Sequence, residues 1–417
     1  MIGRGRRRTG GRASRYARVV GPGVVAGASD NDPTTVGAVT VIGATTGYQL
    51  SWLALLVFPM LAVVQVIAAQ VGVVAGDDLQ TLTTRRYGRR WALVLLASVL
   101  SVNVLTIAAD LEAGAAALGL LLHADWRWFV LPLGAALIAL LVVGSYDDVV
   151  AVLRYVLLGF FAYAASCVLA HPDWGRVLHA TFVPGFSLRG PVATGAVALL
   201  GTTLTGYVYV WETISQAEEH ANARPAKDRL TVARSDAVAG SAFLVATLWF
   251  ILIASGATLG RHHQAVATAQ QAAAALRPLA GPDAAILFAA GLLASAVIAL
   301  PVLMATTAHV VGAHFDWRRG LSEPVGAAAR FYGVLALSIA IGAGAAFAGV
   351  SPIGILVAAS IAGAFGTPVS LAFLVRLARD PQVMHAQVVS RRLSLAAWIV
   401  AAVIASLGLV YLAVSVL

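Results

Sequence analysis

Long apolar runs, separated by short polar segments, occupy nearly the whole chain of 417 residues. About 20 consecutive apolar residues cross a bilayer as a helix, and eleven runs reach that length. The pattern therefore predicts an all-α membrane protein with about eleven transmembrane helices. The expected spans are roughly 19–47, 51–75, 91–122, 126–145, 149–170, 191–217, 236–259, 285–313, 327–349, 352–376 and 393–416.

The first run is interrupted by a polar stretch, Asp30-Asn31-Asp32-Pro33-Thr34-Thr35. Pro33 lacks a backbone N–H and clashes with the preceding turn, so the helix should break just before it. Asp32 followed by Pro33 also reads as an N-cap with proline in the first helical position. We expect a short helix, an unwound stretch near Ala28 to Asn31, and a second helix beginning at Pro33. Broken backbone at membrane depth survives only where it is buried in protein or lines a wet cavity.

The sixth run has a matching interruption, "GTTLTGY", with two glycines and three threonines between Gly201 and Gly206. Two interrupted spans at corresponding positions point to secondary transporters built from inverted repeats, with the site between the two breaks. We therefore expect a LeuT-like inverted repeat of spans 1–5 and 6–10, with helices 1 and 6 broken.

The same pattern predicts the domain organisation. Residues 1–18 form a basic arm, and 19–417 form a single transport domain. Within that domain the first repeat covers 19–170, the second covers 191–376, and 393–416 is an additional helix.

Composition supports a membrane protein and sets its orientation. The chain is 59% hydrophobic and 11% charged, against about a quarter charged in soluble domains. Its net charge of +9 comes from short basic clusters in alternate loops, which argues against nucleic-acid binding and places those loops in the cytoplasm. We expect a multi-pass protein of the cell (inner) membrane, with the N-terminus inside and the C-terminus outside. The N-terminus lacks the apolar segment of a cleavable signal peptide, and the single cysteine, Cys167, excludes a disulfide framework.

A carboxylate at bilayer depth costs several kcal/mol and is by default a functional candidate. Asp32 could bind a cation together with released carbonyls near Ala28 and with oxygens of Thr35, Thr202 and Thr205. All of these donors are oxygen atoms, which suit Mg²⁺, Ca²⁺ or Mn²⁺ better than softer metals. Mg²⁺ gives up water reluctantly, so it would bind partly hydrated. The alternative is that Asp32 only caps the second half-helix.

Five further polar residues are candidates for an ion pathway, each with a structural alternative. Asp30 could face the mouth of the cavity or neutralise an arginine. The acids of span 3 could line the exit or relay protons, or could pair with neighbouring spans. An acid on the inner half of span 6 could attract cations or make a contact inside the bundle. The candidates are Asp30, Asn31, Asp110, Glu112 and Glu212.

The first-span block, "GPGVVAGASDNDPTTVGAVTVIGATTGYQLSW", resembles the opening of Nramp-type divalent-metal transporters, in which Asp-Pro-Gly-Asn holds the metal. "TIAADLEAGAAALGLL" resembles the family's third span, "GTTLTGY" takes the place of its sixth-span segment, and "FAAGLLASAV" is similar to the start of its eighth span. The resemblance covers nearly the whole chain. It implies that Asp32 is a metal ligand.

The departures from the family pattern concern the same site. Thr35 stands at the position of the metal-binding Asn, and Thr202 and Thr205 stand at those of Ala and Met, so the soft thioether is missing. Tyr207 replaces a His that the family associates with proton coupling, and span 9 has no internal arginine. These features are similar to the Nramp-related magnesium transporters, whose sixth span reads GTTxSPYxFFW.

The resemblance therefore implies Mg²⁺ transport, with Mn²⁺ as a second cargo, by alternating access and without proton coupling. It adds Ser360 of span 10 as a further candidate ligand. The metal is substrate, no cofactor is expected, and the partners are the ion and the lipid bilayer, with no obligatory protein partner and no nucleic acid.

Other functions remain open from the residues alone. A proton-coupled Mn²⁺ or transition-metal symporter, or an amino-acid or amine transporter, could use the same architecture. An intramembrane aspartyl protease would need two facing acids, and Asp32 with Asp110 could be proposed, but no Gly-x-Gly-Asp motif occurs. A channel would be expected to show a repeated ring of polar residues, and no such pattern stands out. We therefore expect a transporter and not an enzyme.

Overall fold

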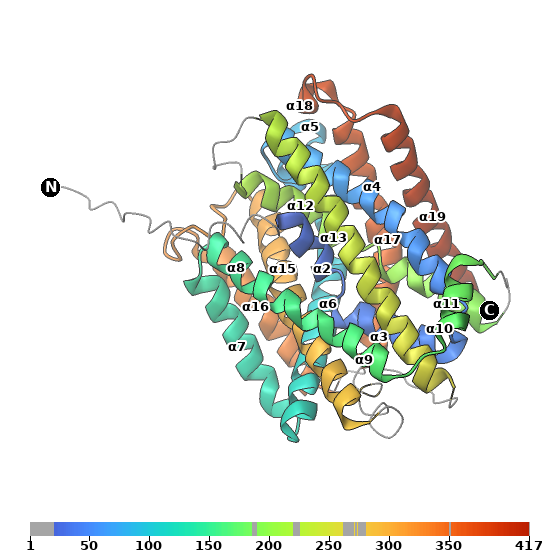
Figure 1. The fold of residues 1–417 in the computed structure, drawn as a ribbon. Coiled ribbons are helices and arrows are strands. Elements are labelled where there is room, and N and C mark those ends of the chain that lie inside the picture. Colours follow the sequence, from blue (N-terminus) through green and yellow to red (C-terminus); the bar gives the residue numbers. More distant parts are fainter. Residues whose placement is uncertain are drawn as a thin grey trace.

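The computed structural model describes residues 21–185, 190–219, 226–261, 271, 273, 281–349 and 352–416, and these residues contain helices and connecting loops without any β-strand. The basic arm predicted at 1–18 lies outside the described residues. Figure 1 shows the long helices packed side by side as one bundle.

The predicted spans are confirmed as helices. Eight helical segments within the described residues are long and apolar enough to cross a membrane, two more are apolar but shorter, and the first span is divided in two. The unbroken spans are α4 (Ser51–Ala75), α6 (Arg89–Leu122), α7 (Arg127–Val143), α13 (Ala226–Ser255), α15 (Pro282–His314), α16 (Ala329–Phe347), α17 (Pro352–Ala378) and α19 (Arg391–Val416).

Three spans are interrupted along their length. Span 1 consists of α2 (Pro22–Ser29) and α3 (Pro33–Thr46), and span 6 of α11 (Pro191–Thr202) and α12 (Gly206–Glu219). The sixth span breaks within the predicted segment, and α3 begins at Pro33 as predicted, but the first break covers residues 30–32 rather than 28–31, because Ala28 and Ser29 still belong to α2. Span 5 was expected as one helix, but it passes through a 3₁₀ turn, η1 (Leu157–Phe160), between α8 (Tyr146–Val156) and α9 (Phe161–Leu169). The seventh span ends in a π-helical turn, η2 (Gly256–Gly260).

Short helices also occur in segments that the hydrophobic pattern leaves as loops. They are α5 (Leu79–Tyr87), α10 (Trp174–Phe182) and α18 (Pro381–Met384). The side chain of Asp78 caps α5 by accepting a hydrogen bond from the backbone N of Thr81 at 2.8 Å, and the helix ends before Gly88, whose φ is 88°. These helices are too short and too polar to show a span-length apolar run, so hydropathy alone does not reveal them.

The half-helix α2 lies inside the bundle, where it packs against α13 and α15 (Figure 1). Its contact with α13 depends on small residues: a Cβ added at Gly27 would lie 2.4 Å from the backbone of Gly240. The carboxylate of Asp236 on α13 accepts hydrogen bonds from the backbone N of Gly21 at 2.9 Å and of Gly23 at 2.6 Å. Close backbone packing of this kind is typical of membrane helices and fixes the position of α2.

Candidate functional site

The break in the first span follows from its sequence. Asp32 has an extended backbone (φ −65°, ψ 160°), and its Oδ1 accepts a hydrogen bond from the backbone N of Thr35 at 2.7 Å. This is the N-cap arrangement expected before Pro33. Residues Asp30 and Asn31 connect the two half-helices. Residues 30–33 and 35 are buried, and Thr34 is partly buried. Asp32 is thus a helix cap, and this role does not use its second carboxylate oxygen.

The break in the sixth span lies against the break in the first. The hydroxyl of Thr35 donates to the backbone carbonyl of Thr202, the last residue of α11, at 3.1 Å. The hydroxyl of Thr205 donates to Oδ1 of Asp30. Two contacts between residues far apart in the sequence therefore join the two interruptions, and they involve four of the predicted site residues.

Tyr207 completes this junction, although sequence reasoning did not include it among the site residues. Its side chain is buried, and its hydroxyl lies 2.6 Å from the carbonyl oxygen of Ser29, to which it donates, and 3.3 Å from Oδ2 of Asp32. A tyrosine in the first turn of α12, immediately after the break, was a signal that could have pointed to it. The sequence argument treated Tyr207 only as the replacement for a histidine.

A second carboxylate meets the start of α3 from the third span. Oδ1 of Asp110, on α6, accepts hydrogen bonds from the backbone N of Thr34 at 3.1 Å and from its hydroxyl at 2.8 Å. A helix N-terminus favours negative charge, and here it receives acids from both α6 and its own cap. Asp110 therefore reaches the first-span break. Its hydrogen bonds fit the structural alternative considered for it, and its position also fits the ion pathway.

Several polar atoms at the junction are buried without a hydrogen-bond partner. They are Oδ2 of Asp30, both amide atoms of Asn31, and Oδ2 of Asp110. Leaving buried polar atoms unpaired costs free energy, so such groups in a folded protein call for an explanation. Three of the four atoms are oxygens that could accept from a donor or coordinate a cation.

The junction gathers three acidic side chains. In the described part of the chain, none of the three carboxylates of Asp30, Asp32 and Asp110 lies within ion-pair distance of a Lys, Arg or His. No group of three His, Cys, Asp or Glu side chains with metal-site geometry occurs among the described residues. A cation held here would thus need hydroxyl and carbonyl oxygens as well as carboxylates.

The remaining predicted residues have varied positions. The carbonyl of Ala28 accepts the backbone N–H of Asn31 at 3.1 Å, so the turn already engages this oxygen. Glu112 follows Asp110 by two residues, which places it on a different side of α6, where it is buried. Glu212 is buried in α12, and its Oε1 accepts from Nε2 of Gln216 at 3.0 Å. Ser360 belongs to α17, and only its backbone is described.

Replacing Tyr207 by phenylalanine tests its place in the junction. We expect a loss of about 1–3 kcal/mol in the free energy of unfolding, because each hydrogen bond contributes roughly 1 kcal/mol, more when a charged group accepts it. We also expect an altered KM for the transported ion. Denaturation of the purified protein and initial uptake rates in proteoliposomes measure the two effects.

Tyr163→Phe is the matched control for this change. The Tyr163 hydroxyl is also buried and shares a hydrogen bond of 3.1 Å with the hydroxyl of Ser295, between α9 and α15. This variant should lose similar stability and keep the wild-type KM. Equal KM changes in the two variants would show that the Tyr207 hydroxyl has no specific role in ion binding at the junction.

Comparison with known proteins identifies the family to which this chain belongs. The family model described as natural resistance-associated macrophage protein-like matches residues 23–414. A divalent metal cation transporter MntH of Deinococcus radiodurans is 31% identical over 284 residues, which are 66% of this chain and 64% of the relative. The chain thus aligns with somewhat less than two thirds of that relative's length. A divalent metal cation transporter MntH of Mycobacterium tuberculosis is 28% identical over 317 residues, covering 72% of this chain and 71% of the relative.

Solved structures show the same fold. The chain superposes on a variant of the Eremococcus coleocola manganese transporter with a TM-score of 0.74 at 18% identity, covering 96% of this chain and 88% of the other. Mhp1, a nucleobase-cation-symport-1 family transporter, superposes with a TM-score of 0.54 at 15% identity, covering 96% and 94%. At these identities the likeness concerns the fold alone.

Proposed function

Because the chain belongs to the natural resistance-associated macrophage protein-like (Nramp) family, we propose that it carries a divalent metal cation across the membrane by alternating access. It is a multi-pass membrane transporter and not an enzyme, and the metal is its substrate rather than a cofactor. The names of its relatives, divalent metal cation transporters, support this class of cargo.

The observation that carries the proposal is the buried junction of the two broken helices. Asp32 is buried there with Asp30 and Asp110 nearby, and no basic side chain of the described residues neutralises them. Buried charges in proteins are paired or coordinate metals. A doubly charged cation would supply the missing positive charge, so we assign Asp32 as its central ligand.

The other proposed ligands are the oxygens that the two breaks bring to Asp32. Their present hydrogen bonds, from Thr35 to Thr202 and from Thr205 to Asp30, would exchange for contacts with the ion. The proposed metal ligands are Asp32, Thr35, Ala28, Thr202, Thr205 and Ser360, and the proposed ion pathway includes Asp30, Asn31, Asp110, Glu112 and Glu212.

We propose Mg²⁺ as the preferred cargo, with Mn²⁺ second. Hydroxyl, carbonyl and carboxylate oxygens are hard ligands, which suit Mg²⁺ and Mn²⁺, and the hydrogen bonds that join the two breaks are all made by such oxygens. The competing proposal is a proton-coupled Mn²⁺ symporter; the name of the Eremococcus coleocola manganese transporter supports its cargo, Mn²⁺. The two proposals differ in selectivity and in proton movement, and both can be measured.

Uptake of Mg²⁺ and Mn²⁺ into proteoliposomes at a fixed membrane potential tests the function itself. We expect saturable uptake of both ions, with Mg²⁺ competing against Mn²⁺, and no competition from amino acids or amines. Absence of divalent-cation uptake, or competition by an amine, would overturn the proposed cargo.

We predict that transport moves no protons. Tyr207 occupies the position of the coupling histidine, and its hydroxyl is bound to Ser29 and Asp32. Arg330 lies at the start of α16, and the rest of that span has no arginine. A pH-sensitive dye inside the vesicles should therefore report the same internal pH with and without Mg²⁺ in the outer buffer. Metal-dependent acidification would establish the coupled alternative.

We further propose that the N-terminus is cytoplasmic and that the C-terminus lies outside. The basic clusters in alternate loops support this orientation. A cysteine introduced at Gly88, between α5 and α6, would then face the cytoplasm, so its labelling should require permeabilised cells. The native Cys167 is buried and gives little background. Labelling in intact cells would indicate the opposite orientation.

A further inference from the structure

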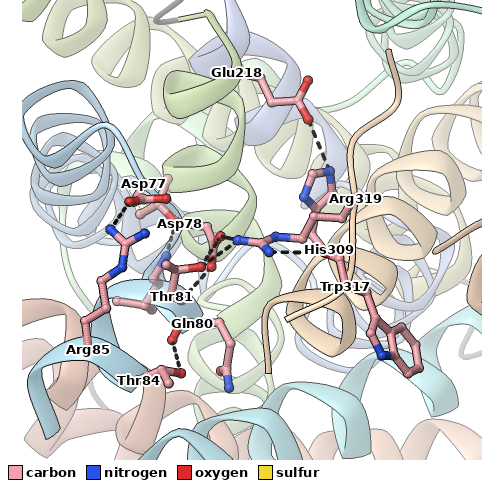
Figure 2. Close-up of polar contacts among 12 residues, drawn as sticks. Asp77, Asp78, Gln80, Thr81, Thr84, Arg85, Glu218, His309, Trp317 and Arg319 are labelled. Carbon is pink, nitrogen blue, oxygen red and sulfur yellow. Dashed lines mark hydrogen bonds and ion pairs between the residues drawn. The ribbon is translucent and has the colours of Figure 1, made fainter. Parts of the chain in front are cut away.

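A second polar cluster lies at the far end of α12, about 17 Å along the helix from Tyr207 at 1.5 Å per residue. There Oε1 of Glu218 lies 3.4 Å from Nε2 of His309 on α15. Figure 2 shows the carboxylate and the imidazole facing each other, with the pair of Asp78 and Arg319 beside them. The same half-helix thus contacts the central junction with one end and this cluster with the other.

Glu218 differs from the other acids of this region in its partner. Asp78 pairs with Arg319 at 3.0 Å, Asp77 pairs with Arg85, and Glu323 pairs with Arg318 at 2.7 Å. Glu218 has no arginine or lysine within ion-pair distance among the described residues; its carboxylate faces the imidazole of His309 and accepts a hydrogen bond from the backbone of Leu321. Glu218 is therefore the acid of this group without a direct ion pair to an arginine, and Arg319 acts on it only from beyond ion-pair distance.

His309 presents a nitrogen lone pair or proton that is not used. Its side chain is 6% exposed, and Nε2 is buried without a hydrogen-bond partner. The edge-on ring of Phe331, at 5.0 Å between centroids, holds the imidazole in place. Both Glu218 and His309 line a cavity of about 330 Å³, whose wall also includes the acids Asp77 and Asp78 and the bases Arg318 and Arg319. This cavity is large enough to hold a hydrated ion beside the two side chains.

We propose that Glu218 and His309 form a second binding station for a divalent cation, next to the inner end of the transport path. Two neighbouring ligands of an octahedral ion, each about 2.1 Å from it, are about 3.0 Å apart, so Oε1 and Nε2, which lie 3.4 Å apart, need to approach each other only slightly. Metal-site geometry with three acidic, His or Cys ligands is not found in the described residues, so water completes the coordination. The inference rests on the proposed function, because it places the station on the path of the transported ion.

The station has a chemistry that the central junction lacks. Imidazole suits Mn²⁺ and the later transition metals, whereas Mg²⁺ prefers oxygen and retains its water. The cavity should therefore hold Mn²⁺ longer than Mg²⁺ on its way out. With only two protein ligands, binding is weak enough to permit release.

The experiment uses this difference in ligands. Electron spin echo envelope modulation of Mn²⁺ bound to the purified, tag-free protein should show ¹⁴N coupling from a coordinated imidazole, because the central junction supplies only oxygen. His309→Gln should abolish the coupling, and Glu218→Gln should weaken Mn²⁺ binding at this station at least about tenfold. His314→Gln, five residues further along α15, is the matched control and should keep the coupling. Absence of ¹⁴N coupling in the wild-type protein, or its persistence in His309→Gln, would overturn the station.

The central site and the station can fail separately. Asp32→Asn should remove the oxygen-only site and leave the ¹⁴N coupling in place. If Asp32→Asn transports normally while the coupling depends on His309, the station stands and the proposed central site falls. If Asp32→Asn is inactive and no ¹⁴N coupling is found, the proposed function stands and the station falls.

Discussion

Asp32→Asn should abolish divalent-cation uptake while the protein still folds and inserts. The amide has the size of the carboxylate, and its oxygen can still accept the hydrogen bond from the backbone N of Thr35, which is 2.7 Å away in the wild type. The change therefore preserves the cap and removes the charge. Loss of the partner of a buried charge costs about 3–5 kcal/mol, which corresponds to a loss of roughly 100-fold or more in affinity.

The comparison of variants separates the two roles of Asp32. Asp32→Ala loses both cap and charge, so it should reduce stability by about 1 kcal/mol more than Asp32→Asn. Asp125→Asn is the control, because Asp125 is a partly exposed acid whose neighbour is Arg127 at 3.8 Å. Initial rates of Mg²⁺ and Mn²⁺ uptake, normalised to the amount of folded protein, give the readout. Wild-type uptake by Asp32→Asn would show that Asp32 is only a helix cap.

The sequence predicts the fold well because the strongest signals are long and local. Eleven apolar runs give eleven spans, and the Pro33 and Gly206 interruptions give the two breaks. Backbone chemistry explains this success. A proline after a capping Asp, and glycines with threonines in mid-span, change helix stability by themselves, whatever the rest of the chain does.

The partners across the junction could not be predicted in the same way. That Thr34 bonds Asp110, that Thr205 bonds Asp30 and that Tyr207 bonds Ser29 depends on how spans separated by many residues rotate against each other. Hydrophobic periodicity is weak in these helices because they are apolar on all sides. The rotation is instead set by close packing such as that of Gly27 against Gly240, which an apolar pattern does not encode.

The polar contacts at the C-terminal end of α12 could not be predicted from the sequence either. Glu218 reads as a solvated helix end, and His309 as one histidine within a long apolar span. Their proximity depends on α12 and α15 packing together, and on Arg319 pairing with Asp78 rather than with Glu218. Which of these two acids Arg319 reaches depends on side-chain positions that differ by less than one helical turn, and a sequence pattern does not determine them.

Thr205→Met should move the selectivity of transport from Mg²⁺ toward Mn²⁺ and Cd²⁺. Thr205 lies in the break of the sixth span, where its hydroxyl contacts Asp30, and it is only partly buried, so a longer side chain has room to adjust. A thioether is a soft ligand that stabilises softer ions and contributes little to Mg²⁺. We expect the ratio of Cd²⁺ to Mg²⁺ uptake to rise about tenfold, equivalent to about 1.4 kcal/mol.

Thr205→Val decides what causes that shift, because valine has nearly the shape of threonine and lacks both hydroxyl and sulfur. If the thioether binds the ion, Thr205→Val should transport both ions less well and leave their ratio unchanged. Competition of Mg²⁺ and Cd²⁺ for uptake at one membrane potential measures the ratio in each variant. If methionine and valine shift the ratio equally, the loss of the hydroxyl bound to Asp30 is the cause. If neither shifts it, the side chain of Thr205 does not face the ion, and the selectivity of the junction must come from the carboxylates and carbonyls alone.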